Sequence, residues 1–156
     1  MTLSTETIDF LKTLPLFARL PEDQMQEIFL LGKKVFYAVG DRLITQDGLT
    51  DCLFVMLDGR VAIEIKDVSA VGERGPKSIL GELAMISQTP RNATCTAITP
   101  VTAVKFRHDQ FWQYVQKSPE LAVGLLTEVI YHLDETIDTL YWMSRELHEL
   151  REAFEK

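Results

Sequence analysis

Short apolar segments with a period of two occupy the middle of the chain. Aliphatic residues alternate with small or charged residues over 61–66, and small apolar residues alternate with threonine over 93–97. A period of two places one face of a strand in the core and leaves the other in water. We therefore expect β-strands in these segments, with a last strand over residues 104–106.

Turn residues separate these apolar segments. Six of the eight glycines fall between residues 40 and 81. Dense turns between short strands are typical of a β-barrel or jelly roll. Asp58-Gly59 predicts a two-residue hairpin turn in which both residues have positive φ. Residues 67–75 are expected to form a loop.

Helical patterns flank the β region. Apolar spacing predicts helices over residues 23–31 and 109–116. Ser118-Pro119 then predicts the start of a long helix that continues to Lys156, because serine is a good cap and proline suits the first helical position.

The long helix carries an apolar stripe. Its members are Leu126, Ile130, Leu133, Ile137, Leu140, Met143, Leu147, Leu150 and Phe154. Steps of four and three residues indicate helix pairing, and the one early step at Met143 predicts local overwinding. Because the stripe runs past what a small barrel covers, we expect a parallel homodimer through this helix. The alternative is one helix that packs on its own barrel.

Composition narrows the class of protein. A length of 156 residues fits one domain, and 46% hydrophobic with 25% charged residues is ordinary for a globular protein. No run is long enough for a membrane span, and the first residues do not resemble a signal peptide, so we expect a cytoplasmic protein. Cys52 and Cys95 lie far apart and are expected to be reduced strand or core residues.

Charge and histidine placement argue against several functions. The net charge of −7, from 16 basic and 23 acidic residues, repels a phosphate backbone, so we expect no nucleic-acid binding by this chain alone. The three histidines are scattered along the chain, at His108, His132 and His148. We expect none of them to have an acidic partner at the spacing of metal ligands. No nucleophile motif is present. We expect no metal site, no catalytic residues and no enzymatic activity.

The segment from Gly81 to Thr94 carries the candidate chemistry. It places the carboxylate of Glu82 and the guanidinium of Arg91 at the two ends of a short helix-sized segment. A helix start attracts anions, and a guanidinium matches two phosphate oxygens at once. An ionised carboxylate only accepts hydrogen bonds, so it suits a ribose hydroxyl. The pattern predicts a site for a sugar phosphate.

The order G-E-L-A followed by P-R-x-A-T resembles the phosphate-binding cassette of the cyclic nucleotide-binding domain family. That family includes bacterial catabolite activator proteins and the regulatory subunits of cyclic AMP-dependent kinase. Residues 16–20, 40–44 and 53–61 resemble the family's N-terminal helical segment, first barrel turn and glycine-turn hairpin. The resemblance runs from about residue 14 to residue 140.

The resemblance and the pattern together predict a mainly β fold with flanking helices. We expect a double-stranded β-helix (jelly-roll) barrel over residues 35–107. N-terminal helices are expected within 1–34, and C-terminal helices with a dimerisation seam within 108–156. The whole of 1–156 is then a single cyclic nucleotide-binding domain.

The resemblance also assigns roles within the cassette. Glu82 would accept the ribose 2′-hydroxyl, and Arg91 would neutralise the cyclic phosphate. The alternatives are a solvated acid at a helix start for Glu82 and an ion pair with Glu82 or another surface acid for Arg91. Close backbone approach and small size would come from Gly81, Leu83, Ala84, Asn92 and Ala93. Asn92 departs from the small residue that the family usually has there.

Recognition of the base is expected on the long helix. Thr136 matches the threonine that reaches the adenine amino group in catabolite activator proteins; the alternative is an ordinary threonine on a helix face. Ile137 is apolar where those activators have a second polar residue. Members that prefer cyclic GMP often have Thr or Ser at the position of Asn92. The resemblance therefore favours cyclic AMP, with cyclic GMP less expected. Apolar lining for the base is expected from Val61, Ile63, Ile79 and Leu80.

The sequence thus predicts a sensor without enzymatic activity or cofactor, in which a cyclic nucleotide couples the barrel to a C-terminal dimerisation helix. The first alternative is the ligand-binding part of a cyclic AMP-dependent transcription regulator whose helix-turn-helix is absent from this chain. The second is a dimerisation or adaptor module with a degenerate pocket. The downstream protein partner is not indicated.

Overall fold

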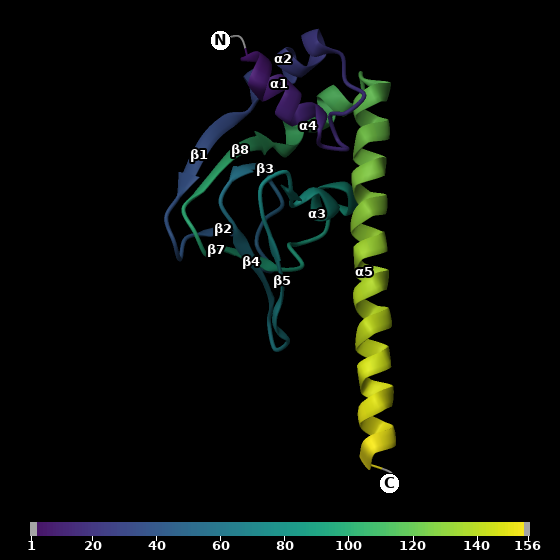
Figure 1. Ribbon diagram of the computed structural model, residues 1–156. Coiled ribbons are helices and arrows are strands. Elements are labelled where there is room, and N and C mark those ends of the chain that lie inside the picture. The colour runs from purple at the N-terminus through teal and green to yellow at the C-terminus, as the bar shows by residue number, and fades with distance from the viewer. Residues whose placement is uncertain (1–2, 155–156) are drawn as a thin grey trace.

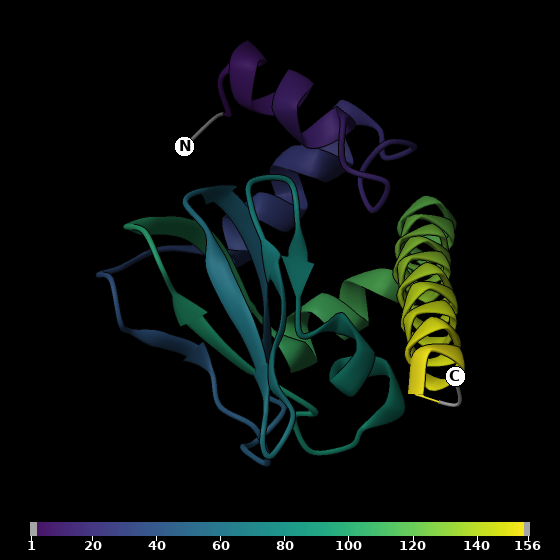
Figure 2. The ribbon, with the colours of Figure 1, turned by 60° about the horizontal axis from the view of Figure 1, so that its bottom comes forward.

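Two antiparallel sheets form the body of the molecule, and helices gather at one end and along one side (Figure 1). The structure is a computed structural model that describes residues 3–154, with the backbone alone described at residues 69 and 70. The helices α3 and α4 lie between the sheets and the long helix α5 (Figure 2).

Each sheet has four strands drawn from distant parts of the chain. The first has the order β1-β8-β3-β6 and consists of β1 (Lys33–Tyr37), β8 (Val101–Arg107), β3 (Cys52–Asp58) and β6 (Ile79–Leu80). The second has the order β2-β7-β4-β5 and consists of β2 (Arg42–Ile44), β7 (Thr94–Ala97), β4 (Val61–Ile65) and β5 (Ser69–Arg74). This arrangement confirms the predicted jelly-roll fold with its strands over 61–66, 93–97 and 104–106.

Asp58-Gly59 links the two sheets, so the predicted hairpin at this position is wrong. β3 pairs with β6 and β8, whereas β4 pairs with β5 and β7. Of the two turn residues only Gly59 has a positive φ, at +87°. A Cβ on Gly59 would lie 2.2 Å from the carbonyl oxygen of Pro100. The glycine is therefore required because the crossing packs closely on the start of β8.

The expected loop over residues 67–75 is also wrong, because β5 occupies most of it. β4 and β5 form an antiparallel hairpin that pairs Val61 with Arg74 and Ile65 with Ser69. Its turn contains Asp67, whose φ is +66°. Backbone pairing with β4 creates this strand although its sequence lacks apolar alternation.

Five helices complete the described part of the chain: α1 (Thr5–Lys12), α2 (Glu22–Leu31), α3 (Glu82–Ser87), α4 (His108–Val115) and α5 (Pro119–Phe154). The predicted helices over 23–31 and 109–116 correspond to α2 and α4. The Ser118 hydroxyl accepts a hydrogen bond from the Leu121 N–H at 3.3 Å, which confirms the predicted cap of α5. Lys156 lies outside the described residues.

Two apolar clusters hold these elements together. One lies between the helices and the first sheet and includes Phe17, Phe106 and Phe111, and the other lies between the sheets around Phe54. Burial of such side chains is the main favourable term in folding. The first cluster extends to the N-terminal part of α5 and so fixes that helix against the body.

The apolar stripe of α5 is largely exposed in the single chain. The residues of α5 that are buried are Leu121, Gly124, Leu125 and Glu128, all in its N-terminal part. Every member of the stripe is at least 49% exposed, and Phe154 is 88% exposed. In the described chain the helix therefore does not use its stripe to pack on the barrel, and its C-terminal part extends well beyond the sheets (Figure 1).

Candidate functional site

A cavity of about 230 Å³ lies between the second sheet, the β6–α3 segment and α5. All predicted site residues except Val61 line it. The full lining is Ile44, Ile63, Ile65, Arg74, Ile79, Leu80, Gly81, Glu82, Leu83, Ala84, Arg91, Asn92, Ala93, Cys95, His132 and Thr136. The fold therefore brings the cassette, the apolar strand residues and the C-terminal helix to one place.

Val61 belongs to the core between the sheets, so its predicted place in the lining is wrong. It is fully buried in the cluster that contains Phe54 and Ala97. Val61 is the first residue of β4 and follows the crossing at Gly59, where neighbouring strands cover it. Ile63 and Ile65 lie further along the same strand and do reach the cavity.

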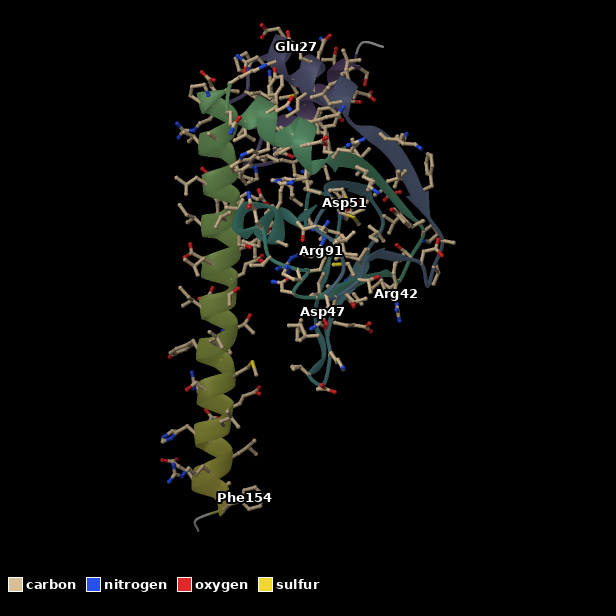
Figure 3. The ribbon with its side chains drawn as sticks, turned by 180° about the vertical axis from the view of Figure 1, so that it is seen from behind. Glu27, Arg42, Asp47, Asp51, Arg91 and Phe154 are labelled. Atoms are coloured by element: carbon tan, nitrogen blue, oxygen red, sulfur yellow. The ribbon has the colours of Figure 1, made fainter. Side chains whose placement is uncertain are left out.

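Arg91 is held inside the barrel rather than in solvent (Figure 3). Its Nη1 donates to the carbonyl oxygen of Gly81 at 3.1 Å, and its Nη2 donates to the carbonyl oxygen of Cys52. Only 4% of Arg91 is exposed. Among residues 3–154 it forms no ion pair with an acid, so the alternative of a pair with Glu82 is not found. A buried cation that faces only dipoles creates a strong preference for an anion.

Gly81 permits this placement of the guanidinium. It caps α3 with a φ of +90°, a conformation that suits glycine, and an added Cβ would lie 2.4 Å from Nη1 of Arg91. Gly81 was predicted to let the ligand approach the backbone closely. In the structure, the group that lies close to Gly81 is the guanidinium of Arg91.

Glu82 is buried and contacts the long helix, so it is not a solvated acid at a helix start. Its Oε1 lies 2.5 Å from Nδ1 of His132, and only 3% of Glu82 is exposed. On its other side His132 places Nε2 3.7 Å from Oε1 of Glu128. The histidine thus stands between two buried carboxylates, and the expectation that the histidines lack acidic partners is wrong.

The electrostatics of this cluster follow from hydrogen bonding and burial. The hydrogen bond with Glu82 raises the pKa of His132 above its usual value, and the charge of Glu128 acts in the same direction. Burial raises the pKa of Glu128, whose Oε2 has no hydrogen-bond partner among the residues that the structure describes. His132 therefore gains a proton more readily than a solvated histidine.

The far end of the cavity is bounded by the β4–β5 hairpin and α5. Nη2 of Arg74 lies 2.8 Å from Oε2 of Glu135 and so connects β5 to α5. Thr136 lines the cavity, and its hydroxyl donates to the carbonyl oxygen of His132 at 2.8 Å. A second hollow of about 690 Å³ shares Arg74 and Thr136 with the first and continues between hairpin and helix.

Both cysteines are free and buried, as predicted, in β3 and β7. Burial raises the pKa of each thiol to about 11, so both stay protonated near neutral pH. Cys95 lines the cavity as a small apolar residue.

Sequence reasoning missed five lining residues: Ile44, Ile65, Arg74, Cys95 and His132. Ile65 continues the alternation of the same strand as Ile63, and His132 precedes Thr136 by one helical turn, so both had a local signal. Arg74 was not predicted to line the cavity, because the strand that contains it was expected to be a loop.

The comparison with known families agrees with this geometry. The family model of the cyclic nucleotide-binding domain matches residues 34–118, which is more than half of the chain. The chain belongs to the cyclic nucleotide-binding domain family. Domains of this family are regulatory modules, and a cyclic nucleotide is the ligand that the family implies for the cavity.

Solved structures of regulators resemble this fold. The N-terminal domain of a transcriptional regulator from Streptomyces coelicolor is 31% identical, with a TM-score of 0.68 over 83% of this chain and 96% of that one. The catabolite activator protein of Thermus thermophilus is 19% identical, with a TM-score of 0.72 over 83% of this chain and 63% of that one, and shows the fold alone.

Curated relatives are longer proteins. A cyclic nucleotide-gated potassium channel of Rhizobium etli is 30% identical over 69% of this chain, which corresponds to 30% of the channel. Glutaminase 2 of Bradyrhizobium diazoefficiens is 29% identical over 71% of this chain, which corresponds to 18% of the glutaminase. This chain therefore spans less than a third of the length of either. Within residues 3–154 no helix is long and apolar enough to cross a membrane.

Proposed function

We propose that this chain is a non-enzymatic sensor that binds a cyclic nucleotide, preferably cyclic AMP, and transmits binding to a dimer formed by α5. The observation that carries the proposal is Arg91, a buried guanidinium that lines the cavity and forms no ion pair with an acid in the described residues. A cyclic phosphodiester carries one negative charge and two free oxygens, which match this cation and its planar donors.

Glu82 supports a ribose at the next position. It lines the same cavity from the first residue of α3, and its ionised carboxylate accepts hydrogen bonds without donating any. A ribose hydroxyl can donate a hydrogen bond to this carboxylate. The small residues Gly81 and Ala84 leave room for the ribose ring. The phosphate on Arg91 and the ribose on Glu82 then direct the base toward α5.

Thr136 supports adenine over guanine at the end of the cavity. Its single hydroxyl proton is already donated to the His132 carbonyl oxygen, so Oγ1 faces a ligand as an acceptor. Adenine presents its N6 amino group as a donor at the position where guanine presents the O6 acceptor. This polarity favours cyclic AMP. A cGMP-dependent protein kinase of Drosophila melanogaster is also among the relatives, so relationship alone does not choose the base.

The exposed stripe of α5 supports the proposed homodimer. Its residues repeat with steps of four and three, which lets two parallel copies interlock, and all of them are accessible in the single chain. The Arg145–Glu149 ion pair at 3.1 Å lies two positions from Leu147 on either side, about 200° around the helix, so these charges are on the other face and leave the stripe apolar. A cyclic nucleotide that contacts α5 at Thr136 would then change how the two helices meet.

Titration calorimetry with cyclic AMP and cyclic GMP tests the proposal. We expect saturable binding of both, tighter for cyclic AMP. Linear AMP serves as a control, because it carries a second charge on a phosphate that is not closed into a ring. Absence of heat with either cyclic nucleotide at high micromolar concentration would overturn the proposal.

The ligand-binding part of a transcription regulator is the second candidate. It is favoured by the 31% identity to the N-terminal domain of the Streptomyces coelicolor regulator, which this chain covers almost fully. The net charge of −7 still argues against DNA binding by these residues themselves. A DNA-binding assay of the full-length gene product distinguishes the candidates. The degenerate adaptor is disfavoured because Gly81, Glu82 and Arg91 are assembled around a cavity. A cytoplasmic location stays a prediction.

A further inference from the structure

We infer that His132 competes with the ribose of the ligand for Glu82, so that nucleotide binding releases a proton and loosens the contact between α3 and α5. His132 is a positioning residue in this scheme, because it acts on the ligand through Glu82. The inference rests on the proposed function and adds a regulation of the same site.

The contact between Glu82 and His132 occupies one of the two carboxylate oxygens that could accept a hydrogen bond from a ribose hydroxyl. Oε1 of Glu82 lies 2.5 Å from Nδ1 of His132, and both side chains line the cavity. The Glu82 side chain is 4% exposed and the His132 side chain 16% exposed, so water has little access to replace either partner. A sugar hydroxyl that donates to Glu82 must therefore displace the imidazole or share the carboxylate with it. Both outcomes weaken the imidazole's hydrogen bond.

The charged groups around His132 come from three elements. Glu82 belongs to α3, Glu128 and Glu135 to α5, and Arg74 to β5, where Arg74 is paired with Glu135. Of the two acids that contact His132, only Glu82 lines the cavity. The ligand therefore changes the contact between His132 and Glu82, and the contact between His132 and Glu128 is unchanged. The phosphate charge is matched by Arg91.

The direction of proton flow follows from these contacts. The hydrogen bond with Glu82 is the largest cause that raises the pKa of His132 in the free protein, while burial and Arg74 lower it. When ribose takes up the carboxylate this cause weakens, so the pKa of His132 falls in the complex and a proton leaves. The affinity for the cyclic nucleotide then rises with pH between the pKa of His132 in the complex and its higher pKa in the free protein. Outside that range the affinity does not depend on this group.

The same exchange has a mechanical consequence. Glu82 and His132 are separated by fifty positions in sequence and form a direct hydrogen bond between α3 and α5. A ribose that weakens this bond removes one attachment of α5 to the cassette. Ligand thereby biases the position of the helix through a contact that differs between free and bound states.

Calorimetry in two buffers of different ionisation enthalpy measures the released proton directly. We expect the heat of cyclic AMP binding to differ between the buffers near neutral pH. We also expect affinity to be about threefold or more tighter at about pH 8 than at about pH 6. The ligand 2′-deoxy cyclic AMP lacks the hydroxyl, so its binding should show neither effect in the unaltered protein.

Two variants complete the test. His132→Asn keeps an amide N–H near the position of Nδ1 but does not titrate, so cyclic AMP binding should lose both the buffer effect and the pH dependence. His148→Asn is the matched control, because His148 lies on the same helix, is solvent-exposed and pairs only with Glu152 at 3.5 Å in the described chain. It should behave as the unaltered protein does. Circular dichroism checks that both variants are folded.

Each outcome decides the inference. Cyclic AMP binding without a buffer effect in the unaltered protein overturns it and leaves the proposed function standing. An equal effect with 2′-deoxy cyclic AMP, or in His132→Asn, also overturns it. If His132→Asn does not fold, the comparison of the two ligands on the unaltered protein still decides. Absence of binding at every pH overturns the proposed function and this inference together.

Discussion

Gly81 and Arg91 are packed so closely that the arginine occupies the space of a missing side chain. The Gly81 carbonyl oxygen accepts a hydrogen bond from Nη1 of Arg91 at 3.1 Å, and a Cβ on Gly81 would lie 2.4 Å from the same nitrogen. The Cys52 carbonyl oxygen holds the other terminal nitrogen. The guanidinium is therefore placed before ligand arrives, which lowers the entropy cost of binding.

Gly81→Ala should displace the guanidinium and weaken cyclic nucleotide binding about tenfold or more. Alanine at this positive φ also adds a backbone cost of about 1 kcal/mol to the folded state, which glycine does not incur. Calorimetry and urea unfolding measure the two effects. Gly72→Ala is the matched control, because nothing lies within 4 Å of its added Cβ, and it should change neither quantity strongly. Equal affinity of both variants would contradict this account of Gly81.

Gly124→Ala tests the attachment of α5 to the body. Alanine has the higher helix propensity by about 1 kcal/mol, so an unconstrained helix would become more stable. At this position, however, the added Cβ would lie 2.0 Å from the Leu16 carbonyl oxygen. We expect the clash to dominate and the free energy of unfolding to fall by about 1–3 kcal/mol in urea titrations. A more stable variant would show that α5 is not held closely at this point.

Leu147→Lys tests the proposed dimer. Leu147 is 66% exposed in the single chain, so the substitution should leave the fold intact while placing two lysines face to face in a paired seam. Light scattering should report a shift from dimer to monomer. Glu149→Lys is the control, because it lies about 200° around the helix from Leu147 and breaks only an exposed pair with Arg145. A monomer before any substitution would contradict the dimer.

Thr136→Val tests the selection of the base. Valine keeps the shape of threonine but removes the oxygen that accepts from adenine, while the His132 carbonyl oxygen keeps its helical environment. We expect cyclic AMP affinity to fall about fivefold, cyclic GMP affinity to change less, and the ratio between them to narrow. Competition against a fluorescent cyclic nucleotide measures this ratio. An unchanged ratio would remove Thr136 from base recognition.

The parts of the fold that depend on local pattern could be predicted from the sequence. The helices α2, α4 and α5 follow from apolar spacing and from the Ser118-Pro119 start, and the cassette is local because its groups lie within one short segment. The Asp58-Gly59 signal marked the break between β3 and β4. It could not say which strands pair, and here the segment joins two sheets.

The rest of the site depends on contacts between distant segments. Arg74 reaches the cavity only because main-chain pairing makes a strand of residues that lack alternation. The contact of Glu82 with His132 joins α3 to α5, and no local rule predicts it. The neighbouring pair of Glu128 and His132 is different, since a spacing of four residues on a helix is readable from sequence.

The central claim is that the buried guanidinium of Arg91 binds the cyclic phosphate. The most direct test is calorimetry of cyclic AMP with the unaltered protein and with Arg91→Lys, which keeps the charge but loses the planar pair of donors. We predict saturable binding by the unaltered protein and affinity about tenfold or more weaker in the variant, with the fold retained by circular dichroism. Equal affinity of the two proteins, or no binding by the unaltered one, would contradict the claim.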